Sequence, residues 1–163
     1  MTKNKTGLSF LWLSAVAFIL DLLTKYIVVQ RFDLYESVNI LPVFNLTYVR
    51  NYGAAFSFLA EHDGWQKYFF IVIAIGISLM LAYFMKKNSV EQKLQNSAYA
   101  LIIGGALANM VDRVYNGFVV DFLDFYWDIY HYPVFNVADI AICIGAGLLA
   151  LDAFKGDKKS GQK

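Results

Sequence analysis

Residues 117–139 read GFVVDFLDFYWDIYHYPVFNVAD and separate two long apolar segments of the chain. The stretch contains four acids, and two of them, Asp121 and Asp139, stand where those segments end and begin. Two carboxylates that face each other at the edge of a bilayer would suit acid/base chemistry on a membrane-bound substrate. Asp124 and Asp128 lie between them, and we expect these two acids in solvent or among lipid headgroups.

The composition is typical of a membrane protein. Of the 163 residues, 58% are apolar and 17% are charged, and the charged share is below the roughly 25% of an ordinary soluble domain. The length suits one domain, so residues 1–163 are predicted to form a single integral membrane domain. No basic face or nucleic-acid-binding motif occurs in the sequence, and we expect no nucleic-acid partner.

Four apolar segments match the length of about 20 residues that a spanning helix needs. We expect spans over about residues 8–29, 68–85, 98–115 and 137–154, with outer loops over residues 30–67 and 116–136. The first segment could instead be a cleaved signal peptide, but it is longer than the apolar core of such peptides and contains Asp21 and Lys25. The predicted fold class is therefore an all-α membrane protein with four transmembrane helices.

The first outer loop is expected to be ordered. Residues 41–49, LPVFNLTYV, are rich in β-branched and aromatic side chains and indicate a small extracytoplasmic β-sheet. Residues 57–65 suit a short interfacial helix whose apolar side chains dip into lipid.

The basic residues predict the orientation of the chain. Nine of the 14 would lie on one side of four spans, namely Lys3, Lys5, Lys86, Lys87, Lys93, Lys155, Lys158, Lys159 and Lys163. Because basic residues concentrate in cytoplasmic segments, both termini are predicted to be cytoplasmic. The two outer loops and the acids between the third and fourth spans then face outward.

Asp121 and Asp139 are the candidate catalytic residues. Asn136 is a candidate N-cap of the fourth helix, and the positive helix end would favour ionised Asp139. Burial behind Phe118 and the two valines that follow it would raise the pKa of Asp121. If the two carboxyls are close, they share one proton, so that one deprotonates a water and the other donates to a scissile carbonyl oxygen. The alternative is a purely structural helix cap and a loop acid.

Other polar residues inside or beside the spans have less specific interpretations. Asp21 and Lys25 share a helix face, either as a buried pair with a functional contact or as a lysine that snorkels to the interface beside its counterion. Asn109, Asp112 and Arg113 are predicted to project from one face of the third helix into the bundle. Surface or packing roles are expected for the remaining candidates, which are His62, His131 and Cys143. No metal-ligand spacing occurs, and neither a metal nor a cofactor is expected.

Five motifs together resemble the bacterial lipoprotein signal peptidases, also called signal peptidase II. They are DLLTK at 21–25, RNYGAAF at 50–56, GGALANMVDR at 104–113, GFVVDF at 117–122 and FNVAD at 135–139. They occur in the family's order and extend from the first span to the last. One departure is Ala108, where the family usually has glycine, and it would affect helix packing rather than the acids.

The resemblance implies an aspartyl endopeptidase of the bacterial inner membrane with its active site facing the periplasm. Its implied substrates are prolipoproteins whose cysteine carries diacylglyceryl, cleaved just before that cysteine. It implies membrane lipid and globomycin-type cyclic peptide inhibitors as further ligands, and we expect a monomer. The implied catalytic pair is Asp121 and Asp139. The implied supporting residues are Asp21, Lys25, Asn51, Gly53, Asn109, Arg113, Asn136 and Ala138.

Two other functions remain open from the residues alone. An ion-coupled transporter would use the intramembrane charges as a relay, although the inner halves of the third and fourth spans are apolar apart from Asp152. A non-catalytic assembly or lipid-binding factor would use the same outer surface without hydrolysis.

Overall fold

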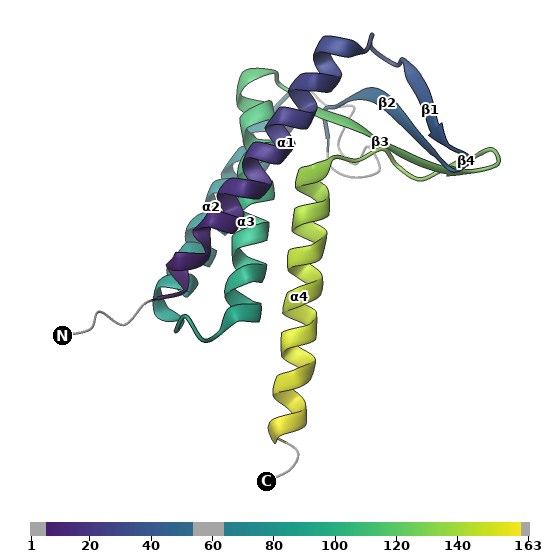
Figure 1. The fold of residues 1–163 in the computed structure, drawn as a ribbon. Coiled ribbons are helices and arrows are strands. Elements are labelled where there is room, and N and C mark those ends of the chain that lie inside the picture. The colour runs from purple at the N-terminus through teal and green to yellow at the C-terminus, as the bar shows by residue number, and fades with distance from the viewer. Residues whose placement is uncertain (1–5, 54–63, 161–163) are drawn as a thin grey trace.

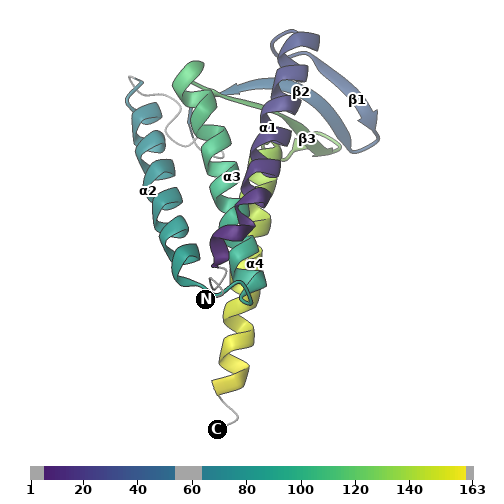
Figure 2. The same ribbon diagram turned by 60° about the vertical axis from the view of Figure 1, so that its left-hand side comes forward.

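The computed structural model describes residues 6–53 and 64–160, the last six of these by their backbone alone. A short 3-10 turn, η1 (Gly7–Phe10), leads into α1 (Leu11–Arg31), and three more long helices follow. These are α2 (Gln66–Lys87), α3 (Lys93–Tyr115) and α4 (Val137–Ser160). The helices run up and down the bundle, so that α1 starts and α4 ends at the same end (Figures 1 and 2).

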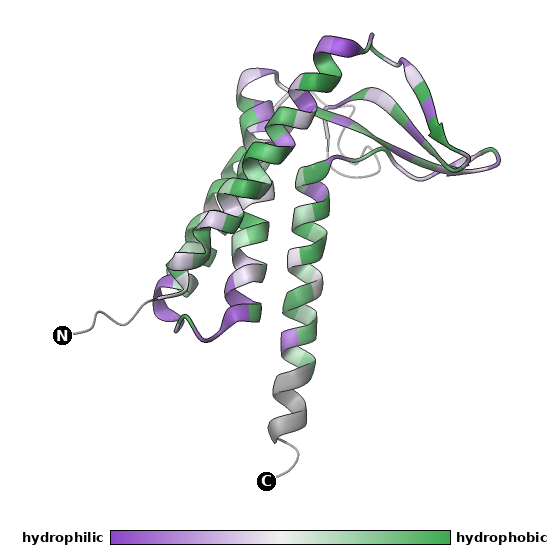
Figure 3. Cartoon of the chain, viewed as in Figure 1, coloured by the Kyte–Doolittle hydropathy of each residue, from purple (hydrophilic) through white to green (hydrophobic). Residues whose placement is uncertain are grey.

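Three of the four expected spans have the length and hydropathy to cross a membrane. They are residues Gly7–Arg31, Gln66–Lys87 and Val137–Phe154. Most residues of α1 and of the coloured part of α4 are hydrophobic (Figure 3), and α1, α2 and α4 expose many large apolar side chains. The remaining helix, α3, contacts each of the other three, and its polar residues lower its mean hydropathy. Polar residues are tolerated on a helix in that central position, because they face the interior of the bundle rather than lipid.

Small residues let α3 approach its neighbours closely. A Cβ atom on Gly104 would lie 2.6 Å from the carbonyl oxygen of Ser14 in α1, and one on Gly105 would collide with the carbonyl oxygen of Ala138 in α4. The hydroxyl of Ser14 also donates to the carbonyl oxygen of Ala100 at 2.6 Å. The glycines therefore hold α1 and α4 against α3 with backbone-to-backbone contact.

Four antiparallel strands form one sheet in the order β1-β2-β3-β4. The strands are β1 (Ser37–Leu41), β2 (Phe44–Asn51), β3 (Val119–Trp127) and β4 (Tyr130–His131). The sheet extends sideways from the end of the bundle where α1 ends and α4 begins (Figure 1). The strand expected over residues 41–49 is confirmed in β2, whereas the strands of the second loop were not expected. The interfacial helix expected over 57–65 falls almost wholly outside the described residues.

Strand β3 has two different faces. Val120 and Phe122 pack with Val28 of α1 and Tyr48 of β2 in a hydrophobic cluster. Because successive side chains of a strand point to opposite faces, Asp121 points away from its neighbours in that cluster. The pairing of β3 with β2 places Asp121 opposite Val49 and Val119 opposite Asn51. The fold thus brings Asn51 beside Asp121 at the rim of the bundle.

Candidate active site

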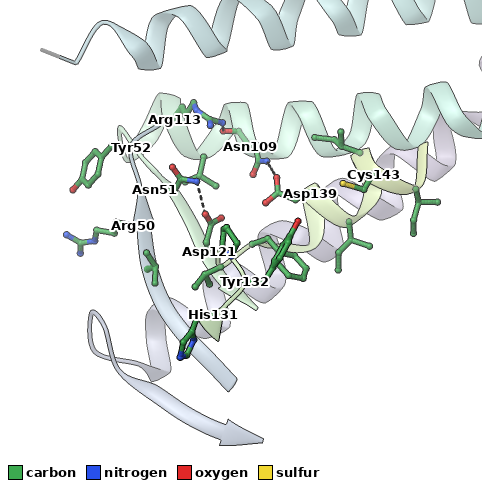
Figure 4. A pocket seen from close by; sticks show the side chains of 18 residues that line it. Arg50, Asn51, Tyr52, Asn109, Arg113, Asp121, His131, Tyr132, Asp139 and Cys143 are labelled. Atoms are coloured by element: carbon green, nitrogen blue, oxygen red, sulfur yellow. Dashed lines mark hydrogen bonds between the residues drawn. The ribbon is translucent and has the colours of Figure 1, made fainter. Parts of the chain in front are cut away.

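A cavity of about 910 Å³ lies between the sheet, α3 and the start of α4. Its walls include Asn51 from β2, Asn109 and Arg113 from α3, and residues 131–135 from the segment that leads into α4. Asp121 and Asp139 both line it (Figure 4). The two aspartates are 18 positions apart in the chain, one on a strand and one on a helix, and the fold places both in the wall of the same cavity.

Asp121 is almost fully buried, with 2% of its surface exposed. Each of its carboxyl oxygens accepts a hydrogen bond from an amide side chain. Asn51 Nδ2 donates to Oδ2 at 2.9 Å, and Asn136 Nδ2 donates to Oδ1 at 2.6 Å. These two bonds fix the orientation of the carboxyl group from β2 on one side and from the start of α4 on the other.

Asp139 lies in the first turn of α4, and both its oxygens also accept hydrogen bonds. Asn109 Nδ2 donates to Oδ1 at 2.9 Å, and the backbone N–H of Asn136 donates to Oδ2 at 3.2 Å. The backbone N–H of Asp139 in turn donates to Asn136 Oδ1 at 2.9 Å. This reciprocal pair is a capping box, and the prediction that Asn136 caps the helix is confirmed.

Burial raises the pKa of Asp121 from 3.8 to about 7. That value is the net result: burial is the largest cause, the nearby charge of Asp139 also raises the pKa, and the hydrogen bonds from Asn51 and Asn136 lower it. The raised pKa that the sequence predicted for Asp121 is therefore found in the structure. A carboxyl with a pKa near neutrality can hold a proton at physiological pH and donate it.

Behind the two aspartates lies a buried ionic cluster. Lys25 Nζ is 2.7 Å from Asp21 Oδ2 and 3.0 Å from Asp112 Oδ2, and it donates to Asn109 Oδ1 at 2.8 Å. Only 3% of the Lys25 side chain is exposed, so the interpretation of Lys25 as a snorkelling residue is wrong. Asp21 Oδ1 accepts the backbone N–H of Ala138 at 2.7 Å.

Arg113 connects the β2 end to α3. Its Nη2 donates to the carbonyl oxygen of Gly53 at 3.0 Å, and its Nη1 donates to that of Asn109 at 3.2 Å. The Gly53 N–H donates to Asn51 Oδ1 at 3.0 Å. The guanidinium also lies over the Phe70 ring of α2, 4.8 Å from its centroid. Arg113 therefore holds the turn that aims Asn51 at Asp121.

Five of the ten residues that the sequence singled out line this cavity, namely Asn51, Asn109, Arg113, Asp121 and Asp139. Lys25, Gly53 and Asn136 are hydrogen-bonded to lining residues, Ala138 directly precedes Asp139, and Asp21 accepts the Ala138 N–H. Asp112 was noted in the sequence but was not proposed for the site, although it contacts Lys25. The signal that could have identified it is its charge within an expected span, three residues after Asn109 and beside Arg113.

Two expectations about individual residues are wrong. Asp124 was expected in solvent, but it is 3% exposed. It accepts hydrogen bonds from Thr47 at 2.9 Å and from Asn45 at 3.3 Å, and its Oδ1 lies 2.8 Å from His131 Nδ1. Burial alone would raise the pKa of Asp124, but these partners hold it below its ordinary value. Cys143 was expected to be a packing residue, but it is exposed and lines the cavity.

Asp128 and His131 are exposed, as expected, and His131 forms part of the cavity wall. His62 lies outside the described residues. Within residues 6–53 and 64–160, no three His, Cys, Asp or Glu side chains gather in a way that could hold a metal ion.

Comparisons with known proteins agree on one family. The profile of the family described as "Signal peptidase (SPase) II" matches residues 13–155. A lipoprotein signal peptidase of Haemophilus influenzae (strain PittGG) is 84% identical over 160 residues, covering 98% of this chain and 94% of that protein. The lipoprotein signal peptidase of Pasteurella multocida (strain Pm70) is 77% identical over 163 residues, covering 100% of this chain and 99% of that protein.

A solved structure titled "Bacterial membrane enzyme structure by the in meso method at 2.3 A resolution" has the same fold. It superposes with a TM-score of 0.82 at 34% identity, and the match covers 95% of this chain and 92% of that one. A second, titled "Bacterial membrane enzyme structure by the in meso method at 1.9 A resolution", has a TM-score of 0.78 at 32% identity, covering 90% and 93%.

Proposed function

Because this chain belongs to the signal peptidase II family, we propose that Asp121 and Asp139 are its catalytic pair. The chain is a membrane-bound aspartic endopeptidase that removes signal peptides from prolipoproteins. The observation that carries the assignment of the pair is the shared partner Asn136. It donates its side-chain amide to Asp121 and its backbone N–H to Asp139 in the same cavity.

The two carboxyls have different roles in the proposed reaction. Asp139, ionised in the first turn of α4, takes a proton from a water molecule held in the cavity, and the water oxygen attacks the scissile carbonyl carbon. Asp121 donates its proton to the carbonyl oxygen. The tetrahedral intermediate then collapses as Asp139 passes its proton to the leaving nitrogen and Asp121 recovers one from the geminal hydroxyl. The pKa of about 7 for Asp121 supports its role as the acid.

The apolar part of the cavity supports a lipidated substrate. Ile140, Ile142 and Ile144 of α4 line it beside Asp139, and α4 has the hydropathy of a membrane-spanning helix. A precursor whose cysteine carries diacylglyceryl would enter laterally from the bilayer and be cleaved just before that cysteine. Globomycin-type cyclic peptides would occupy the same cavity. One chain supplies both aspartates, which supports a monomer as the active unit.

We propose that α3 is a fourth span and that the cavity faces the periplasm. The contacts of α3 with all three apolar helices support its position across the same membrane. Lys86, Lys87 and Lys93 lie at the opposite end of the bundle, where α2 ends and α3 begins, and basic residues of this kind support cytoplasmic termini.

The test is cleavage of a diacylglyceryl-modified precursor by purified protein in micelles. Asp121→Asn and Asp139→Asn should each abolish cleavage while the thermal unfolding transition remains. Asp128→Asn is the matched control, because Asp128 is an exposed acid in the turn between β3 and β4, and it should cleave like the wild type. Turnover near the wild-type rate in either of the first two variants would exclude the pair.

A further inference from the structure

The residue before each proposed catalytic aspartate donates its backbone N–H to a buried carboxylate. The N–H of Val120, which precedes Asp121, donates to Asp112 Oδ2 at 3.1 Å. The N–H of Ala138, which precedes Asp139, donates to Asp21 Oδ1 at 2.7 Å. The two acceptors come from α3 and α1, so neither bond belongs to the ladder of a sheet or to a helix cap within α4.

Lys25 joins the two acceptors. Its ammonium group has three N–H donors, and three oxygens lie within reach. Two belong to Asp21 and Asp112, and the third is Asn109 Oδ1. Asn109 is itself hydrogen-bonded to Asp139. A continuous chain of contacts thus runs from the backbone at Asp121 through Lys25 to the backbone at Asp139.

The charged members of this network of contacts are buried. The exposed fractions of the side chains are 3% for Lys25, 0% for Asp21 and 8% for Asp112. Buried ionic groups of this kind contribute little net stability compared with apolar residues of similar volume, because their desolvation offsets their attraction. Stability alone is therefore a poor explanation for three charges at this place.

We propose that Asp21, Lys25 and Asp112 act as a brace that sets the separation of Asp121 and Asp139. The proposal rests on the catalytic pair proposed above. It makes Asp112 a positioning residue: its carboxylate acts on Asp121 through the backbone of Val120 and does not contact the reacting atoms. Removing it would let β3 move relative to α4 and so change the space between the two carboxyls.

Asp112→Ala and Asp112→Asn test the brace in the cleavage assay. We expect Asp112→Ala to lower kcat about 100-fold, the cost of a displacement near 1 Å, with little change in KM. Asp112→Asn keeps an oxygen that can accept the Val120 N–H but loses the charge that pairs with Lys25. It should recover part of the rate and remain about 10-fold below the wild type.

Ser14→Ala is the matched control, because it removes another buried polar contact between α1 and α3, Ser14 to Ala100, with a residue that does not line the cavity. It should leave kcat within about threefold of the wild type. The brace is contradicted if Asp112→Ala loses no more kcat than Ser14→Ala, or if Asp112→Ala and Asp112→Asn are equally impaired.

Two comparisons separate a failure of the brace from a failure of folding and from a failure of the catalytic pair. If Asp112→Ala does not fold in micelles, Asp112→Asn decides: a wild-type kcat overturns the brace, and a reduced kcat at constant KM supports it. Asp121→Asn is measured in parallel. An active Asp121→Asn would overturn the catalytic pair, whereas an inactive one together with a fully active Asp112→Asn would overturn only the brace.

Discussion

Asn136 and Asp139 cap each other at the start of α4: the Asp139 N–H donates to Asn136 Oδ1 at 2.9 Å, and the Asn136 N–H donates to Asp139 Oδ2 at 3.2 Å. A structural cap was the alternative to catalysis when only the sequence was considered. In the structure Asp139 has the geometry of a cap and also lines the cavity. The structural role as a cap is therefore compatible with the catalytic role that we propose for Asp139.

The two contributions of Asn136 can be separated with Asn136→Ser. Serine is also a good N-cap, but its side chain is too short to reach Asp121 Oδ1, to which Asn136 now donates. The buried Asn136 amide also donates to Asn109 Oδ1 and to the carbonyl oxygen of Val120, so we expect both Asn136→Ser and Asn136→Ala to lose stability and most of their activity. Asn136→Ser should be about 1 kcal/mol more stable than Asn136→Ala, because it keeps the cap. Thermal unfolding and precursor cleavage measure the two effects. Full activity in Asn136→Ser would show that the amide contact to Asp121 is dispensable.

The raised pKa of Asp121 predicts how activity and stability depend on pH. Activity should fall as the pH rises through about 7, because Asp121 then loses the proton it donates. Since the folded-state pKa lies above the ordinary value of 3.8, the folded state binds this proton more tightly than the unfolded state does. The stabilisation by Asp121 is therefore complete below pH 3.8 and is lost as the pH rises to about 7.

Unfolding temperatures of the wild type and Asp121→Asn between pH 4 and pH 8 check this prediction, over roughly the window in which such a group titrates. The wild type should lose stability relative to Asp121→Asn as the pH increases, and the difference should level off above pH 7 or so. Parallel curves for the two proteins would mean that Asp121 titrates normally.

The contact between Gly105 and α4 predicts a packing effect on the site. A methyl group at Gly105 would meet the carbonyl oxygen of Ala138, next to Asp139, so Gly105→Ala should displace the first turn of α4. We expect a loss of about 1–3 kcal/mol in stability and lower activity. Gly147→Ala is the control, because a methyl group there would meet nothing within 4 Å. It should stabilise α4 by up to about 1 kcal/mol. Equal behaviour of the two variants in unfolding and cleavage would contradict the close approach.

Much of the helical part of the fold was predictable from the sequence, because apolar runs of spanning length are a strong local signal. Hydropathy gave a weaker signal for α3 as a membrane span. Much of its surface faces other helices, whereas hydropathy measures only the transfer of a side chain into lipid. Strand β3 was not expected, because residues 119–122 are all buried and so do not alternate between polar and apolar side chains as a half-exposed strand does.

The motifs indicated the proposed site residues, but they did not indicate which of these residues contact one another. Asn51 is 70 residues from Asp121, and Lys25 is 84 residues from Asn109. The same limit explains the error over Asp124, whose partners Asn45 and Thr47 are 79 and 77 residues away. Spacing along a chain indicates neighbours within a helix or a strand, whereas the burial of a loop acid depends on what the tertiary fold places beside it.

The two faces of β3 restrict where this protein can change its length. Inserting or deleting one residue before Asp121 in β3 would exchange the faces and turn the carboxyl toward Val28 and Tyr48, away from the cavity. Within the β3–β4 hairpin, length variation among functional descendants should therefore be confined to the exposed turn between Trp127 and Tyr130. Growth or shortening there leaves both carboxyls on the side where they meet.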